Sequence, residues 1–162
     1  MRKISSEINY EVYDSSDELS GDDRKLLEQA IDATGSAYAP YSNFHVGAAV
    51  LLENGVVVKG SNQENAAYPS GLCAERVALF SASAHNPGVT ICAIAITARF
   101  SDSMGLLSVS PCGDCRQVMA EYEHRFHASI RLIMTGENGK IVVVPSIKTL
   151  LPLMFNSDSL KK

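Results

Sequence analysis

Three cysteines and a glutamate have the residue types and spacing of a metal-assisted hydrolytic site. Cys112 and Cys115 form a C-x-x-C pair directly after Pro111, where the pattern predicts the start of a helix. Residues three apart share one helix face, so both sulfurs can reach one cation. The positive end of the helix dipole favours the thiolate form that binds metal. Taken alone, the pair fits a zinc half-site, a thioredoxin-like redox pair or two buried cysteines.

A second segment offers the other half of such a site. Cys73 also lies where a helix is expected to begin, and Glu75 follows it by two residues. On a regular helix that offset turns Glu75 roughly 200° away, so it is poorly placed as a fourth ligand. With Cys73 at the helix cap, Glu75 could face the open side of the metal, and three protein ligands with one open position are the layout of catalytic zinc. Without the cysteine motifs, Glu75 would be interpreted as an acidic residue that stabilises a helix N-terminus.

The elements that must position these residues alternate between helices and strands. Helices are expected at about 20–37, 73–84 and 113–124, with a short last one at 146–151, and strands at 44–52, 56–60, 89–97, 130–135 and 140–144. Asn54-Gly55 between the first two strands is a hairpin signal. This order predicts an α/β protein whose mixed sheet is covered on both faces. Residues 1–20 are polar and are expected to form an N-terminal extension to one domain over 21–162.

Composition and charge bound the function classes. The chain has 162 residues, 46% of them apolar and 20% charged, which suits a globular domain. The net charge is −4, and no cluster of Lys and Arg could follow a phosphate backbone, which argues against a nucleic-acid polymer as partner. The first twenty residues show no apolar signal region, and the longest apolar runs are too short to span a membrane. Four cysteines without an export signal indicate a reducing compartment, so a cytoplasmic location is expected.

Several motifs together resemble the small cytidine deaminases. They are Tyr38-Ala-Pro-Tyr-Ser-Asn-Phe44-His-Val-Gly-Ala-Ala49, Asn62-Gln-Glu64-Asn65-Ala-Ala-Tyr68, Cys73-Ala-Glu-Arg-Val-Ala-Leu, Ser110-Pro-Cys-Gly-Asp-Cys-Arg-Gln-Val and Leu150-Leu-Pro. Cys-x-Glu followed by Pro-Cys-x-x-Cys is similar to the zinc-deaminase signature. Cys as the first ligand is similar to the small homotetrameric enzymes rather than to the polynucleotide-editing branch. The resemblance covers about residues 24–155 and implies a three-layer α/β/α sandwich with a mixed five-stranded sheet.

The resemblance also implies an activity and a cofactor. The activity would be hydrolytic deamination of cytidine and 2′-deoxycytidine to uridine and 2′-deoxyuridine, with release of ammonia, for pyrimidine salvage. Zn²⁺ would be held by Cys73, Cys112 and Cys115 and would lower the pKa of water toward about 7. Glu75 would take the proton of that water, pass it to N3 of the base and then protonate the leaving amine.

Three thiolates would leave the metal site with excess negative charge. The resemblance implies that Arg76 hydrogen-bonds ligand sulfurs and offsets this charge, as second-shell donors tune a metal's acidity. An exposed helical arginine is the alternative, and Arg116 is the second candidate for the same role.

Other residues are assigned to the substrate by the same resemblance. Asn62 and Glu64 would bind the ribose hydroxyls, although ordinary turn chemistry is the alternative. Phe44 would pack on the pyrimidine ring, unless it is only a core residue, and the backbone N–H of Ala74 could hold the base carbonyl. A carboxylate beside the sugar would disfavour a phosphorylated sugar, because two anions repel.

The family resemblance finally implies a homotetramer whose active sites are built across subunits. Tyr68 and Phe155 are the candidate cross-subunit residues. The match at Phe155 is weaker, because Leu153 and Met154 stand where small residues would be expected. Cys92 lies in an apolar run and is interpreted as a buried small hydrophobe rather than a ligand.

Three other interpretations stay open. A structural zinc module would need a fourth protein ligand. A thioredoxin-like redox protein would leave Cys73 and Glu75 without a role. Within the enzyme class, the runner-up is a blasticidin-type deaminase acting on a modified cytosine nucleoside, although Asn62-x-Glu64-Asn65 resembles ordinary cytidine deaminases more closely.

Overall fold

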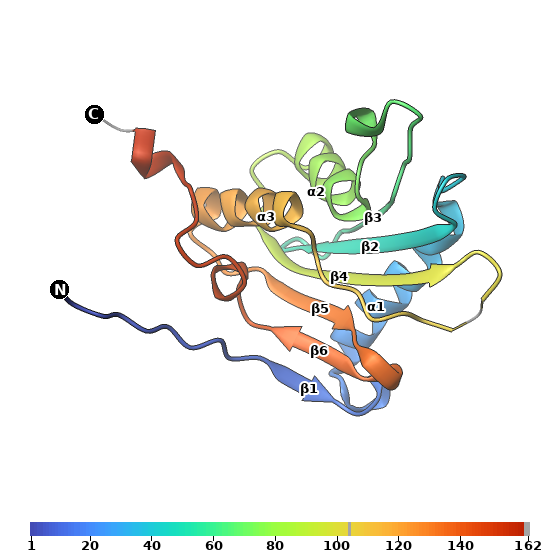
Figure 1. The fold of residues 1–162 in the computed structure, drawn as a ribbon, viewed down its shortest axis with the longest axis horizontal. Coiled ribbons are helices and arrows are strands. Elements are labelled where there is room, and N and C mark those ends of the chain that lie inside the picture. The colour runs from blue at the N-terminus through green and yellow to red at the C-terminus, as the bar shows by residue number, and fades with distance from the viewer. Residues whose placement is uncertain (104, 161–162) are drawn as a thin grey trace.

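A mixed sheet of six strands separates two layers of helices in the computed structural model, which describes residues 1–103 and 105–160 (Figure 1). The strands are β1 (Glu11–Tyr13), β2 (Phe44–Leu52), β3 (Val57–Ser61), β4 (Ile91–Phe100), β5 (Arg131–Thr135) and β6 (Ile141–Val144). Their order across the sheet is β1-β6-β5-β4-β2-β3. Only the β4–β5 pair is parallel, and the other neighbours are antiparallel. The predicted mixed sheet is confirmed.

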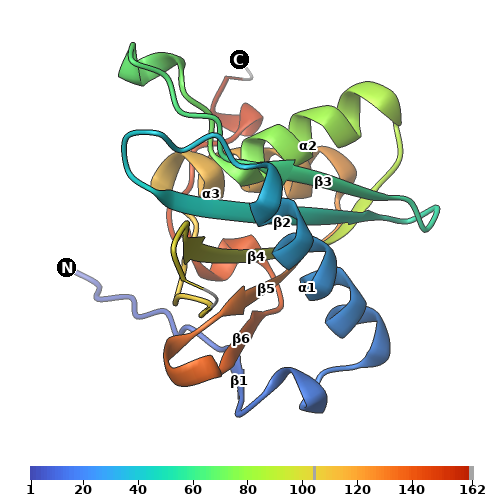
Figure 2. The same cartoon turned by 90° about the vertical axis from the view of Figure 1, so that its right-hand side faces the viewer.

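The helices cover both faces of this sheet, as predicted. They are α1 (Gly21–Ala33), α2 (Ala74–His85) and α3 (Gly113–Phe126). Helix α1 packs on one face, where Leu27 and Ala30 meet Ala95 and Ile133 in one apolar core. Helices α2 and α3 lie on the other face (Figure 2), over a larger core. None of the helices in the described residues has the length and apolar character that a membrane crossing requires.

Five strands are predicted from the sequence, and the sheet has six. The additional strand, β1, comes from the polar segment 1–20 and pairs antiparallel with β6, with Val12 opposite Val142. Leu19, from the same segment, is buried against α1. A strand of three residues carries too little alternation to be recognised in a polar segment, and its partner lies about 130 positions further along the chain. Part of the extension is therefore integral to the sheet.

The other element boundaries differ from the predicted ones by a few residues. Ser20 caps α1, and its side chain accepts a hydrogen bond from the backbone N–H of Asp23 at 3.2 Å. The helix ends at Ala33 and passes into a 3-10 turn over Thr34–Ser36, instead of continuing to residue 37. The expected last helix over 146–151 is a single 3-10 turn over Ile147–Thr149. Further short turns cover Ser16–Glu18, Tyr68–Ser70, Glu137–Gly139 and Ser157–Leu160.

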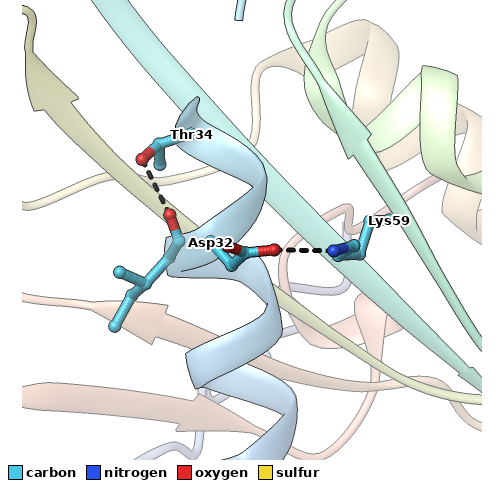
Figure 3. Close-up of polar contacts among 4 residues, drawn as sticks. Asp32, Thr34 and Lys59 are labelled. Atoms are coloured by element: carbon cyan, nitrogen blue, oxygen red, sulfur yellow. Dashed lines mark hydrogen bonds and ion pairs between the residues drawn. The ribbon is translucent and has the colours of Figure 1, made fainter. Parts of the chain in front are cut away.

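Contacts at one end of α1 tie this helix to the edge of the sheet. Lys59 of β3 forms an ion pair with Asp32, 2.6 Å from Nζ to Oδ2, and the Thr34 hydroxyl donates to the Ile31 carbonyl oxygen at 2.7 Å (Figure 3). The ion pair is exposed, so it contributes little to stability. The Thr34 bond lies in the turn through which the chain leaves α1 on its way to β2.

A glycine in β3 allows α2 to lie close to the sheet. A Cβ atom at Gly60 would stand 2.5 Å from the Ala78 backbone nitrogen and 2.6 Å from the Ala74 carbonyl oxygen. Such distances are too short for any side chain, so a glycine within a strand here marks a close backbone approach. The first turn of α2 is thereby held against the ends of β2 and β3.

Candidate active site

Two helix N-termini converge on a cluster of three sulfurs. Cys73 is the N-cap residue of α2 and Cys112 is the N-cap residue of α3, both with extended backbone (φ −70°, ψ 151° and φ −66°, ψ 171°). Neither side chain caps its own helix, so both sulfurs are directed elsewhere. Cys115 follows one turn into α3 and is fully buried. The spacing of the two motifs thus places all three sulfurs together.

The distances within this cluster fit a zinc ion. The three Sγ atoms lie within 4.8 Å of one another, with 3.9 Å between Cys73 and Cys112 and 3.4 Å between Cys112 and Cys115. Tetrahedral zinc with Zn–S bonds of about 2.3 Å would hold its sulfurs roughly 3.8 Å apart. All three cysteines are free. Within 1–103 and 105–160, no histidine, carboxylate or fourth cysteine joins the group, so one coordination position is left open.

The charges around the cluster favour a thiolate at Cys73. The pKa of Cys73 is lowered to about 5, chiefly by a hydrogen bond from the Cys115 thiol and also by Arg76. The Arg76 Nη2 atom lies 3.7 Å from the Cys73 sulfur. The pKa of Cys115 is raised, because its thiol donates to Cys73 and is buried. Arg76 therefore lies where the resemblance implies, with its positive charge against a ligand sulfur.

Glu75 lies in the first turn of α2 and lines the same cavity as Cys73 and Cys112. Its side chain is only 4% exposed, and this burial raises the pKa of its carboxyl group. A carboxylate whose pKa is raised accepts a proton more readily than an ordinary glutamate does.

An open cavity of about 1000 Å³ surrounds these groups. Its wall includes Cys73, Cys112, Glu75 and Arg76, together with Phe44, Asn62, Glu64 and Tyr68. The cavity is at the upper end of the sizes that small-molecule sites span. Most of the residues singled out in the sequence therefore meet in one place, although they come from β2, the segment after β3, α2 and α3.

The predicted sugar-contacting residues are held by hydrogen bonds within the chain. The Asn62 side chain accepts from the Val46 N–H at 2.8 Å and donates to the Phe44 carbonyl oxygen at 2.9 Å. The Glu64 carboxylate accepts from the Tyr41 N–H at 2.9 Å and from the Ser42 hydroxyl at 2.5 Å. These donors, the Ser42 hydroxyl first, lower the pKa of Glu64, so its carboxylate stays ionised.

The remaining assigned residues have different surroundings. The Phe44 ring lies edge-on to Phe100, 5.7 Å between centroids, and also lines the cavity. Ala74 is fully buried as the first residue of α2. The Tyr68 side chain is 91% exposed at the cavity wall. Phe155 is more than half exposed and lies outside the cavity wall, where its carbonyl oxygen accepts from Gln117.

The surroundings of Arg116 and Cys92 differ from those expected from the sequence. Arg116 donates to the carbonyl oxygens of Pro111 and Leu150, at 2.9 and 3.1 Å, so its guanidinium anchors the segment after β6 to the start of α3. Cys92 lies in β4 outside the sulfur cluster and is partly exposed rather than fully buried.

The sequence did not point to two contributors to the site. Ser42 holds Glu64 from 22 positions away, through a turn in which Asn43 takes a left-handed backbone (φ 56°). Asp114 lines the cavity beside Cys115. The only signal in the sequence was the position of both residues inside the quoted motifs.

Comparisons with known proteins agree with the fold and the sulfur cluster. The family model described as "Cytidine and deoxycytidylate deaminase zinc-binding region" matches residues 20–129. A cytidine deaminase of Halalkalibacterium halodurans is 39% identical over 141 residues, which are 86% of this chain and 98% of that protein. One of Sporosarcina psychrophila is 41% identical over 140 residues, 86% of this chain and 95% of that protein. The crystal structure of cytidine deaminase from Burkholderia pseudomallei has a TM-score of 0.69 at 41% identity, covering 85% of this chain and 100% of that one.

Fold and site together define a zinc-binding deaminase with an α/β architecture. Among such proteins, the chain belongs to the cytidine deaminase family. The predicted family, fold class and cofactor are confirmed. This family membership decides against the two other classes considered from the sequence, a structural zinc module and a thioredoxin-like redox protein.

Proposed function

We propose that this protein hydrolyses cytidine and 2′-deoxycytidine to uridine and 2′-deoxyuridine, releasing ammonia, as a step of pyrimidine salvage. The observation that carries the proposal is the buried Glu75 beside three clustered sulfurs that leave one metal position open. A closed four-ligand site could not offer that position to a reactant. The family membership supports the same reaction.

The chemistry divides between the metal and Glu75. When bound by Cys73, Cys112 and Cys115, zinc supplies a Lewis acid that makes a water nucleophilic at neutral pH. Glu75 accepts the proton that this water loses and delivers it to N3 of the cytosine ring. It then takes the second proton of the water from the hydroxyl group now on C4 and gives it to the amine, so the water oxygen stays on C4 as the carbonyl and ammonia leaves. One carboxylate serves as base and acid in turn because its raised pKa suits both roles.

Other residues of the cavity orient the nucleoside. Asn62 and Glu64 bind the ribose hydroxyls, and the hydrogen bonds that already fix both side chains pre-organise them for this task. Phe44 packs on the pyrimidine ring, and the N–H of Ala74 holds the base carbonyl. Arg76 offsets the charge of the thiolates without touching the substrate. The ionised Glu64 disfavours a phosphorylated sugar.

The open cavity and the position of Phe155 support a cytoplasmic homotetramer. A nucleoside does not fill about 1000 Å³, and Phe155 is exposed away from the cavity of its own chain. We infer that Phe155 reaches the cavity of a neighbouring subunit and that Tyr68, exposed at the wall, meets a neighbour. The four free cysteines suit a reducing compartment. We also propose one deaminase domain over 21–162 with residues 1–20 as its extension, of which β1 and Leu19 pack on the sheet and core of that domain.

An ultraviolet assay of nucleoside deamination tests this proposal directly. Cytidine and 2′-deoxycytidine should both be converted, because both sugars keep the 3′- and 5′-hydroxyls that Glu64 and Asn62 can bind. Cytosine and CMP should lose at least about 10²-fold in kcat/KM, since cytosine leaves polar groups unpaired at roughly 1–3 kcal/mol each and CMP adds a phosphate near Glu64. A preference for CMP would overturn the sugar-side assignment, and no conversion of any of the four would overturn the activity.

A further inference from the structure

Residues 1–10, the segment before β1, form an N-terminal arm. It runs away from the edge of the sheet as an extended trace in both views (Figures 1 and 2). Its larger apolar side chains are open to solvent, with Ile4 83%, Ile8 52% and Tyr10 56% exposed. Val12, in β1, continues the series at 52%. The family model begins to match only at residue 20, so the arm lies outside the matched region.

From Lys3 to Val12 the odd positions are all polar, and every even position except Ser6 is apolar or aromatic. Such alternation is typical of a β-strand that buries one face. Within β1, Val12 lies opposite Val142, which packs against the core on the side of α2 and α3. The even positions therefore continue a sheet face that is apolar further along. An extended segment with an apolar face and free backbone groups is a template for pairing with another strand.

The strand that pairs with β1 cannot extend its pairing to the arm. In the β1–β6 ladder Glu11 lies opposite Val143, so Asn9 would lie opposite Pro145. Proline has no N–H to donate to a ladder and is confined to edges and ends of strands. Pairing with β6 therefore stops at Glu11, and the strand edge of residues 1–10 is open to pairing with a segment from outside this sheet.

The charges of the arm make it complementary to a second copy of itself. Arg2 and Lys3 lie at its outer end, whereas Glu7 and Glu11 lie toward the body. Two such arms running antiparallel bring the basic end of each beside the acidic end of the other. In the register that sets Ile4 opposite Ile8, Lys3 lies diagonal to Glu7 and Glu11 of the second copy, close enough for favourable cross-strand pairs. No two like charges face each other in this register.

We propose that the N-terminal arm pairs antiparallel with the arm of a second copy of this chain, with Ile4 opposite Ile8 and a two-fold axis at Ser6. The contact is isologous, so one surface serves both chains. Its main-chain hydrogen bonds resemble those of other strand additions, and the alternate apolar side chains set the register. This contact is separate from the cavity and from any cross-subunit role of Phe155.

Disulfide trapping in the full-length, zinc-loaded protein tests this register. Two serines at the axis have Cα atoms close enough for a disulfide, so Ser6→Cys should form an interchain cross-link under mild oxidation. Ser5→Cys is the matched control, because Ser5 lies opposite Glu7 rather than its own copy. A Ser6→Cys yield no higher than that of Ser5→Cys would overturn the proposal. Unchanged zinc content and circular dichroism would show that the bodies stay folded.

Charge reversal then tests the complementarity with the same readout. In the Ser6→Cys background, Glu7→Lys with Glu11→Lys makes an all-basic arm, and Arg2→Glu with Lys3→Glu makes an all-acidic one. Each variant alone should lose most of the cross-link, by about 5-fold or more, because like charges then oppose pairing. An equimolar mixture should restore it as heterodimers. If the charge reversals leave the cross-link yield unchanged, or if the mixture does not recover it, antiparallel pairing of the arms is wrong.

Discussion

The cavity has two sides that are built in different ways. The sulfur side, with Cys73, Cys112 and Glu75, stands on the first turns of two helices that pack against the sheet. The sugar side, with Asn62 and Glu64, stands on the segment after β3 and is held by hydrogen bonds to β2 and the turn before it. In the proposed mechanism, bonds change on the side built on helical turns, and the sugar is bound on the side built on hydrogen-bonded loops. The difference predicts that damage to the sulfur side abolishes turnover, whereas damage to the sugar side lowers it.

The largest effect is expected from losing a ligand on the sulfur side. Cys112→Ser should lower zinc content to well below one per chain and activity by at least about 10³-fold, because the Lewis acid is lost. Metal analysis together with the cytidine assay measures both. Cys92→Ser is the matched control and should keep zinc and activity, since Cys92 lies outside the cluster. Full zinc in Cys112→Ser would contradict the three-sulfur site.

A smaller effect is expected from the sugar side. Glu64→Gln should lower kcat/KM for cytidine by about 10- to 100-fold, the equivalent of one poorly paired polar group. The loss for CMP should be smaller, because the change also removes a repulsive charge. Glu53→Gln, at the exposed hairpin between β2 and β3, is the control for an acidic residue away from the cavity. An equal loss for both substrates would show that the Glu64 charge does not repel the phosphate, and no loss for cytidine would show that Glu64 does not bind the ribose.

A change at Arg76 should affect chemistry more than binding. Arg76→Gln should lower kcat roughly 10-fold with little change in KM, because the guanidinium contacts a sulfur at 3.7 Å. Arg76→Lys keeps the charge and should recover part of the loss. A raised KM with unchanged kcat would instead place Arg76 on the substrate.

The smallest expected effect is the pH dependence of stability at Glu64. Its pKa is lowered by the Ser42 hydroxyl and the Tyr41 N–H, so the unfolded chain binds its proton more readily than the folded chain does. The carboxylate therefore adds stability that is complete above the ordinary glutamate pKa of about 4.3 and is lost as pH falls through the lower folded value. Denaturant unfolding should show the protein and Glu64→Gln converging in that range. A difference independent of pH would mean that these hydrogen bonds do not favour the ionised form.

The sequence predicted the sulfur side of the cavity more completely than the sugar side. Cys73, Cys112 and Cys115 could be grouped from the chain alone, because each motif lies at one helix start and local periodicity sets its geometry. The partners of Glu64 could not be predicted, since Ser42 reaches it through a turn shaped by the left-handed backbone of Asn43. Local spacing determines the first arrangement, and loop conformation determines the second.

The same limit applies to the fold. Helices α1, α2 and α3 and five strands follow from their periodicity and from the Asn-Gly turn, within a few residues at each end. Strand β1 could not be predicted, because three residues give no usable pattern and its pairing with β6 joins distant parts of the chain. The close approach of α2 at Gly60 likewise depends on tertiary packing.

In the proposed mechanism, Glu75 moves the protons at an intact zinc site. Turnover of cytidine by Glu75→Gln, measured in preparations whose zinc content is also determined, tests it most directly. If Glu75 moves the protons, both proteins should hold about one zinc per chain and share one fold, and the variant should lose roughly 10²- to 10⁴-fold in kcat. Near-normal turnover in a zinc-loaded Glu75→Gln protein would show that Glu75 does not move the protons and only stabilises the N-terminus of its helix.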